Sequence, residues 1–204
     1  MVGENDKERY LSDFRRFRAS RPREPQWIAP IRDAAIASFA EIGFPSSREE
    51  EWRYTNVARV VATPFRQAFE LDGDLGAEYH ASPDELRLVF VNGRFVRGAS
   101  HMENMPPGLE LLPLAEVIAA GGARLERHLA HHAKYDRNGF TALSTAFLED
   151  GAFVSIADGA VIDQPIHLTF VTSAAKGDVI SQAMSEIGGF AIDQALTAKK
   201  ADSA

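Results

Sequence analysis

Hydrophobic side chains near the N-terminus recur at the spacing of one face of a helix. They are Tyr10, Leu11, Phe14 and Phe17, and charged residues lie between them. This period predicts an amphipathic helix that buries its aromatic side. Prolines in the run at residues 20–25 are expected to end the helix, because proline lacks the N–H that a helix interior requires.

A second helix is predicted to begin near Pro30, since proline fits the first turn of a helix. Gly43 stands where a C-terminal glycine cap is expected, and Pro45 prevents the helix from continuing. The stripe that we expect this helix to bury consists of Ile31, Ala34, Ala35, Ser38, Phe39 and Ile42.

The segment FPSSREEEWRYTNV, residues 44–57, places three glutamates directly before two aromatic residues. Two serine–glutamate pairs in it have the three-residue spacing of a capping box at a helix start. We therefore predict that the glutamates cap a helix, and that Trp52 packs against the preceding helix. The two candidate pairs are Ser46–Glu49 and Ser47–Glu50.

The middle of the chain alternates between strand-like and helix-like patterns. Asn92-Gly93 lies between two β-prone runs, which predicts a hairpin. Further along, short strands without intervening helices indicate either an antiparallel sheet or the first rungs of a β-solenoid. The elements expected after the hairpin are a strand and a helix within 108–122, helices within 123–133 and 138–153, and strands within 151–173.

These patterns predict an α+β protein with three parts. Residues 1–70 form an N-terminal helical region, and residues 71–175 form an α/β region that leads into the strands. Residues 176–204 are expected to form a C-terminal helix that is interrupted by Gly188-Gly189 and ends in a polar tail.

The composition narrows the class of protein. The chain has 204 residues, of which 45% are hydrophobic and 25% charged, and its formal net charge is −7. That charge argues against a broad basic surface for nucleic acid. The absence of cysteine excludes disulfides, thiol nucleophiles and cysteine metal ligands. We expect a cytoplasmic protein, because no apolar run reaches the roughly 18 residues of a membrane span and the charged N-terminus lacks a secretory signal.

Histidines are the first candidates for metal-ligating or catalytic residues. His128, His131 and His132 have the i, i+3 and i+4 spacing at which helical side chains share a metal ion. No glutamate follows His128 in the pattern of zinc proteases and no third ligand is marked, so a solvated helix face is the preferred interpretation. His167 lies inside a predicted strand, where a packed or edge position is preferred over a catalytic one.

Carboxylate pairs and a cluster of arginines are the remaining candidates. Asp84-Glu85 and Glu149-Asp150 are adjacent along the chain, so their side chains point apart and mark the ends of elements rather than an acid–base pair. The arginines suit an acidic partner, although a solvated face is preferred. No GxSxG, P-loop or GxGxxG motif occurs, and we assign no catalytic, cofactor-binding or metal-ligating residue. The clustered arginines are Arg15, Arg16, Arg18, Arg21 and Arg23.

Four ordered sequence blocks carry a family resemblance. The first is REEEWRYTNV at 48–57, followed by Pro64-Phe65. The others are LVFVNGRFV at 88–96, LPLAEVIAAG at 112–121 and NGFTALSTAFLEDGAFVSIADGAVIDQPIHLTFV at 138–171, in which Ser144 stands where asparagine is common. Together they resemble the SufB/SufD family of the SUF iron–sulfur cluster assembly system, and the first block resembles the SufD subunit in particular.

The resemblance implies a scaffold without its own catalysis. Family members have an N-terminal helical region, a central right-handed parallel β-helix and a C-terminal helical domain, so the strands within 151–171 would begin the β-helix. The implied partners are SufB-like and SufC-like subunits, and the assembled complex handles the iron–sulfur cluster and ATP, which leaves no cofactor in this chain. Family members are longer, and no residue of their late functional region is recognised here, so none is carried over.

Two classes of function follow. One is a SufD-like scaffold that needs no nucleic acid, membrane or small-molecule substrate. The other is a metal- or small-molecule-binding enzyme on a solenoid-like sheet that uses His128, His132 or His167. The open edge of a solenoid needs a cover, either the helix at 176–204 or another chain, so a homodimer is also expected.

Overall fold

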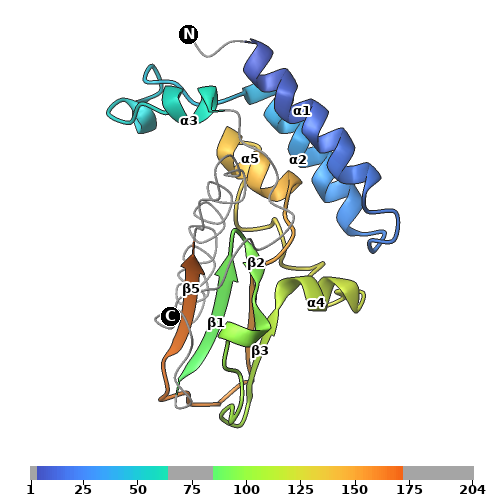
Figure 1. Ribbon diagram of the computed structural model, residues 1–204, viewed down its shortest axis with the longest axis vertical. Coiled ribbons are helices and arrows are strands. Elements are labelled where there is room, and N and C mark those ends of the chain that lie inside the picture. The colour runs from blue at the N-terminus through green and yellow to red at the C-terminus, as the bar shows by residue number, and fades with distance from the viewer. Residues whose placement is uncertain (1–3, 64–84, 172–204) are drawn as a thin grey trace. The chain divides into compact units, whose positions relative to one another are not determined.

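The computed structural model describes residues 4–63 and 85–171 (Figure 1). The described elements belong to two compact units. The first unit contains the helices α1, α2, α3 and α5, and the second contains strands β1 to β5 with the helix α4. The predicted α+β class, with helices at the N-terminus, is confirmed.

The first unit is built on α1 (Glu4–Ala19), α2 (Ile28–Ile42) and α5 (Gly139–Ala146). α1 and α2 lie side by side, and α5 packs on α2 (Figure 1). Phe14 and Phe17 of α1 are buried, which confirms the predicted aromatic face of the first helix. Bulky rings dominate this core because they remove the most apolar surface from water.

The predicted second helix forms, but the face that it buries is rotated. Ala35 and Phe39 are buried as expected, and Ile28 and Arg32 are buried with them. The rotation follows from α5, which packs on this face and accepts a hydrogen bond from Arg32. The predicted positions that are not buried are Ile31, Ala34, Ser38 and Ile42.

The end of α2 and the segment after it follow the predicted capping chemistry. Gly43 has a φ of 71°, and its N–H donates to the carbonyl of Phe39 at 2.8 Å, so the glycine cap is confirmed. The N–H of Ser46 donates to the carboxylate of Glu49 at 2.8 Å, as in a capping box. The element that follows is a single 3₁₀ turn, Glu50–Trp52, rather than an α-helix.

The two aromatic residues of this segment have different surroundings. The ring of Trp52 lies 5.5 Å from that of Phe140 in α5, a partner that the sequence pattern did not indicate. Tyr54 is 92% exposed, and the guanidinium of Arg53 lies 5.6 Å from its ring centroid. Only Trp52 therefore packs against a helix of this unit.

A side chain of α1 holds the short helix α3 (Ala58–Ala62). The guanidinium of Arg9 donates to the carbonyls of Val61 and Thr63 at 3.0 and 2.9 Å. Carbonyls at the end of a helix have no partner within the helix, so a cation from a neighbouring helix stabilises them.

The helix predicted over residues 123–133 is wrong, because this stretch consists of turns. Ala130 has a φ of 63°, and a right-handed helix cannot continue through such a residue. Gly121 and Gly122, at its start, also have positive φ values of 100° and 62°. Leu125 is nevertheless buried. The apolar spacing therefore predicted the burial of this residue correctly, although it predicted the wrong secondary structure.

The second unit contains the predicted hairpin. β1 (Leu86–Val91) pairs antiparallel with β2 (Arg94–Phe95). Asn92 and Gly93 join them with φ values of 49° and 77°, and these two residue types tolerate such angles best. A short 3₁₀ turn, Arg97–Ala99, follows β2.

The strands of this unit pair in both directions. β5 (Ile166–Val171) runs parallel to β1 over its whole length, which gives a sheet in the order β2-β1-β5. β3 (Leu109–Pro113) and β4 (Ala152–Ile156) form a separate antiparallel pair. α4 (Leu114–Ala119) follows β3 directly, so the strand and helix predicted within 108–122 are confirmed.

The two sheets share one hydrophobic core. Leu88 and Phe90 of β1 pack with Leu111 of β3, and all three are at most 1% exposed. Period-2 alternation places Val89 and Val91 on the opposite face of β1, where they form a smaller cluster with Ala99. β1 is therefore buried on both faces along the apolar run Leu88–Val91.

Three sequence expectations fall outside the described residues. They are the domain boundaries near residues 70 and 175 and the helix within 176–204. Within the described part of the chain, no helix combines the length and the apolar character needed to cross a membrane.

Candidate functional site

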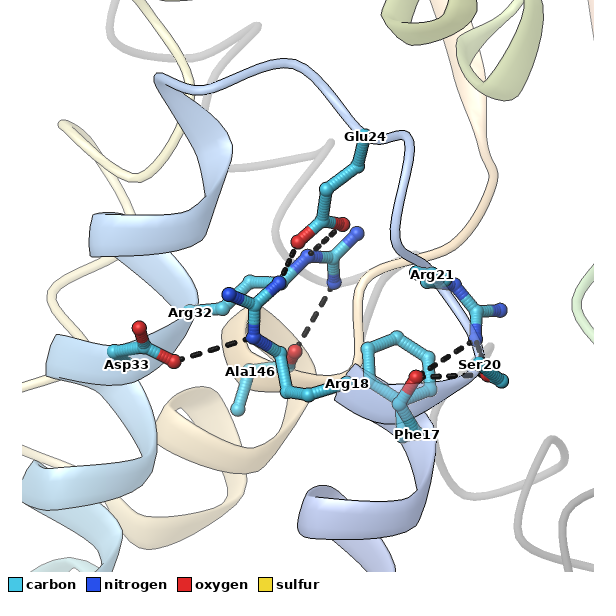
Figure 2. A network of polar contacts seen from close by, with 8 residues as sticks. All are labelled: Phe17, Arg18, Ser20, Arg21, Glu24, Arg32, Asp33 and Ala146. Atoms are coloured by element: carbon cyan, nitrogen blue, oxygen red, sulfur yellow. Dashed lines mark hydrogen bonds and ion pairs between the residues drawn. The ribbon is translucent and has the colours of Figure 1, made fainter.

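Arg32 is the centre of a polar network in the first unit (Figure 2). Its side chain is only 3% exposed. One guanidinium nitrogen donates to the carbonyl of Ala146 at the end of α5 at 3.0 Å, and Nε donates to Glu24 at 3.1 Å. The guanidinium also lies 5.0 Å from the ring centroid of Phe17. One buried cation thus joins α1, α2, α5 and the connection between α1 and α2.

Two arginines share the carboxylate of Glu24. It accepts a hydrogen bond from Arg32 and forms an ion pair with Arg18 (Figure 2). The Nε of Arg18 also lies 3.3 Å from the carboxylate of Asp33 in α2. Because Glu24 is only 11% exposed, water screens these pairs less than it screens surface ion pairs. The network therefore holds the connecting loop against both helices.

The guanidinium of Arg21 lies over the ring of Phe17, with 3.8 Å between its carbon and the ring centroid. It donates to the hydroxyl of Ser20 at 3.0 Å and to the carbonyl of Phe17 at 3.4 Å. That carbonyl belongs to the last turn of α1, where backbone acceptors lack helical partners. A cation–π contact and a helix cap are therefore combined in one side chain.

The chemistry available to Arg32 follows from its burial. Burial first, and then the charge of Arg18, lower the pKa of Arg32 to about 10, while Asp33 opposes this shift. The group is still protonated at neutral pH, so it is a hydrogen-bond donor and not a general base. Because the pKa is lower in the folded protein than in the unfolded chain, the associated stability penalty is present below about pH 10 and disappears as the pH rises further.

A surface pocket of about 460 Å³ borders this network. Its lining contains two arginines and two carboxylates, so positive and negative charges balance. The ion pairs of Arg18 with Glu24 and Asp33 already use these charges inside the unit. We therefore assign no ligand to the pocket. Its lining residues are Arg18, Arg21, Pro22, Glu24, Gln26, Ala29, Pro30 and Asp33.

The predicted arginine cluster is largely engaged in ion pairs within the first unit. An acidic partner for these arginines stays a prediction, and the exposed members of the cluster are Arg15, Arg16 and Arg23. Such pairs at the surface contribute little stability individually. The internal pairs are Arg15–Glu8 at 2.8 Å, Arg16–Asp13 and Arg18–Glu24.

The structure does not bring the candidate histidines together. His128, His131 and His132 lie on exposed turns, and the left-handed residue Ala130 removes the helical spacing on which a shared metal depends. His167 lies on β5, opposite Arg87 of β1. Over residues 4–63 and 85–171, no group of three or more histidine, aspartate or glutamate side chains is arranged to hold a metal ion.

Asp150 organises the loop connections of the second unit. One carboxylate oxygen accepts from the N–H of Ala115, in the first turn of α4, at 3.0 Å and from that of Gly151 at 2.9 Å. The other accepts from the N–H of Phe95 in β2 at 2.9 Å. A carboxylate that accepts three backbone donors holds the turn in a fixed conformation.

The neighbouring carboxylates are also used at the ends of elements. Glu149 lies 3.2 Å from the guanidinium of Arg94, and Glu85 lies 2.6 Å from that of Arg87. Asp84 lies outside the described residues. Glu149 and Asp150 therefore both make contacts at the ends of elements, where the sequence places them.

Asp150→Ala is expected to lower the free energy of unfolding by about 2 kcal/mol, because hydrogen bonds to a charged acceptor contribute about 1.5–3 kcal/mol. Urea unfolding followed by circular dichroism measures the change. Asp150→Asn, which keeps one acceptor oxygen, should lose less. Equal stability of Asp150→Ala and the unmodified chain would contradict the assignment.

Sequence reasoning missed the central residue of the polar network. Arg32 was not a candidate because a charged residue on a helix is normally solvated. Its position is four residues after Ile28 and three before Ala35, on the face that α2 buries. The spacing of Arg32 from Ile28 and Ala35 therefore placed it on one possible buried face of α2. Only the packing of α5 shows that this face is the buried one.

The described geometry defines an α+β protein in which buried and partly buried charges hold loops and helix ends in place. Residues 4–168 match the family described as SufBD protein N-terminal region. The chain therefore belongs to the SufBD family.

Two curated relatives illustrate how much of a longer protein the chain covers. The iron–sulfur cluster assembly SufBD family protein slr0076 of Synechocystis is 30% identical over 145 residues, which is 69% of this chain and 32% of that protein. A tRNA-2-methylthio-N(6)-dimethylallyladenosine synthase of Mycobacterium sp. (strain MCS) is 27% identical over 180 residues, 87% of this chain and 31% of that protein. The chain spans about a third of the length of these relatives.

Proposed function

We propose that this chain is a non-catalytic scaffold component of iron–sulfur cluster assembly, with SufD-like character. The observation that carries the proposal is the match of residues 4–168 to the N-terminal region of SufBD proteins. The relative from Synechocystis supports it, because its name places it in iron–sulfur cluster assembly. The SufD-like assignment rests on the REEEWRYTNV block at 48–57.

The proposed partners are SufB-like and SufC-like subunits. In this proposal the assembled complex handles the iron–sulfur cluster and ATP, and the chain itself holds no cofactor and acts in the cytoplasm. It needs no nucleic acid, membrane or small-molecule substrate. The arrangement of its charges supports a structural role, because Arg32, Glu24 and Asp150 are engaged in fixing loops and helix ends.

The proposed fold of the complete scaffold is a right-handed parallel β-helix that begins in the second unit. The parallel pairing of β1 with β5 supports this, since each residue of one strand stands beside its counterpart on the other. The rings of Phe90 and Phe170 stack at 5.1 Å with an angle of 16° between their planes. Stacked identical side chains on parallel strands are typical of solenoids, in which each rung covers the next.

Co-expression with SufB-like and SufC-like subunits from the same source tests the proposal. The tagged chain is expected to retain both subunits through affinity purification and gel filtration. Loss of both subunits, while circular dichroism shows a folded chain, would contradict the scaffold role.

Metal analysis of the purified chain tests the enzymatic alternative in the same preparation. We expect no stoichiometric zinc or iron, and no change in metal content in His128→Ala, His132→Ala or His167→Ala. Stoichiometric metal that any of these substitutions removes would favour the alternative, because imidazole is a common ligand for both metals.

A further inference from the structure

The connection between α4 and α5 is the longest segment without a helix or strand among the described residues. It covers residues 120–138, whereas most connections in a compact domain have about 4–6 residues. Loops of more than about 12–15 residues without secondary structure are uncommon, and those that are held in place usually carry a function. The connection is therefore a candidate for a role beyond joining two helices.

Buried anchors hold this connection against the first unit. Leu125 is 6% exposed, and Tyr135 packs against the aromatic cluster of α1. At Gly122 a Cβ would lie 2.6 Å from the ring of Trp27, so the backbone itself approaches that ring. The N–H of Leu129 donates to the carbonyl of Leu125 at 2.8 Å. The polar side chains between these anchors therefore stand on a backbone of defined conformation.

Residues 124–137, which we call the basic loop, differ in charge from the rest of the chain. The loop has four arginine and lysine side chains against two carboxylates, whereas the whole chain carries −7. It also contains three of the six histidines of the chain. All of these side chains are exposed, and they are Arg124, Glu126, Arg127, His128, His131, His132, Lys134, Asp136 and Arg137.

Three cations of the basic loop are available to another molecule. Within the described part of the chain, no ion pair involves Arg127, Lys134 or Arg137. Three arginines of the N-terminal cluster, in contrast, pair with carboxylates of their own unit. A carboxylate that binds the basic loop therefore breaks no internal ion pair at these three positions.

We propose that the basic loop is a docking surface for an acidic protein, whose carboxylates pair with Arg127, Lys134 and Arg137. An arginine can bind a carboxylate through two parallel hydrogen bonds, which adds orientation to the attraction between charges. Because the loop is already held by its anchors, little conformational freedom is lost on binding. The inference goes beyond the proposed scaffold function and does not rest on it.

The surroundings of the basic loop favour an acidic protein over a nucleic acid. Proteins that bind single strands combine cations with exposed aromatic rings on which bases stack. The aromatic ring of the basic loop, that of Tyr135, packs against the core instead. A nucleic acid also extends its phosphates past the loop, toward a chain whose net charge of −7 repels them. An acidic patch on a protein can be confined to the loop.

A fluorescein-labelled oligoglutamate peptide serves as the probe, and fluorescence anisotropy measures its binding to the full chain. We expect binding that weakens as sodium chloride is added, because salt screens exposed charges. Replacing three cations of the loop by glutamine should weaken binding about tenfold, since each exposed ion pair contributes little by itself. This loop variant combines Arg127→Gln, Lys134→Gln and Arg137→Gln.

A control variant loses the same number of charges from the N-terminal arginine cluster. We expect it to bind the probe nearly as well as the unmodified chain, and circular dichroism should show that both variants are folded. Absence of binding by the unmodified chain, or equal loss in the two variants, would overturn the inference. Tighter binding of an oligothymidylate of equal charge would overturn it in favour of a nucleic acid. The control variant combines Arg15→Gln, Arg16→Gln and Arg23→Gln.

Discussion

Gly139→Ala is expected to destabilise the helical unit by about 3 kcal/mol or more, at the upper end of the cost of overpacking. A Cβ at this position would overlap the carbonyl oxygen of Gly43 and lie 2.9 Å from its carbonyl carbon. Both atoms belong to the backbone, so no rotation of a side chain relieves the overlap. The substitution must instead separate the end of α2 from the start of α5, the helix pair with the most extensive packing in this unit.

Urea unfolding followed by circular dichroism measures this effect, and Gly98→Ala is the matched control. A Cβ at Gly98 meets nothing within 4 Å. We expect its free energy of unfolding to stay within about 0.5 kcal/mol of the unmodified chain, as for most surface substitutions. Similar stabilities of the two variants would show that the close approach of Gly43 and Gly139 is not required.

Arg32→Ala is expected to lower the free energy of unfolding by about 3 kcal/mol, the low end of the cost of breaking a buried ion pair. The carbonyl of Ala146 loses its donor, Glu24 loses one of its two arginines, and a cavity remains beside Phe17. Part of this loss is offset because the buried cation is itself costly, as its lowered pKa indicates. The expected net loss of stability remains large, because Glu24 and the carbonyl of Ala146 stay buried after Arg32 is removed.

Two further variants separate the role of geometry from the role of charge. Arg32→Lys keeps the charge but cannot reach Ala146 and Glu24 with one planar group, so we expect it to recover only part of the lost stability. Arg15→Ala removes an exposed arginine that pairs with Glu8, and we expect a change below about 1 kcal/mol. If Arg32→Ala were no less stable than Arg15→Ala, the network would not hold the unit together.

The sequence predicted those elements that the conformational preferences of neighbouring residues determine. Asn92-Gly93 requires a tight hairpin whatever surrounds it, and Gly43 ends α2 because it accepts a positive φ. The sequence also predicted strand β3 and the helix α4 that follows it, because short-range patterns indicate both elements. The helix predicted over 123–133 failed because apolar spacing reports which residues are buried, and turns can bury the same residues.

The site residues were harder to predict because their roles depend on distant partners. Arg32 and Ala146 are 114 positions apart, and Asp150 binds the N–H of Phe95, 55 positions away. No local pattern records such pairs. Within the described residues, one backbone angle at Ala130, which the residue type does not suggest, removes the helical spacing of His128 and His132.

The sequence by itself determined the α+β class, the first two helices, the hairpin and the resemblance to the SufB/SufD family, because these depend on residue order and short-range preferences. The tertiary structure decided which face of α2 is buried, that Arg32 joins segments within the first unit and Asp150 joins segments within the second, and that β5 pairs parallel with β1. These features depend on contacts between segments that are far apart in the chain. The residues that pack against a side chain decide whether it is buried and which hydrogen bonds it makes, and the local sequence does not specify them.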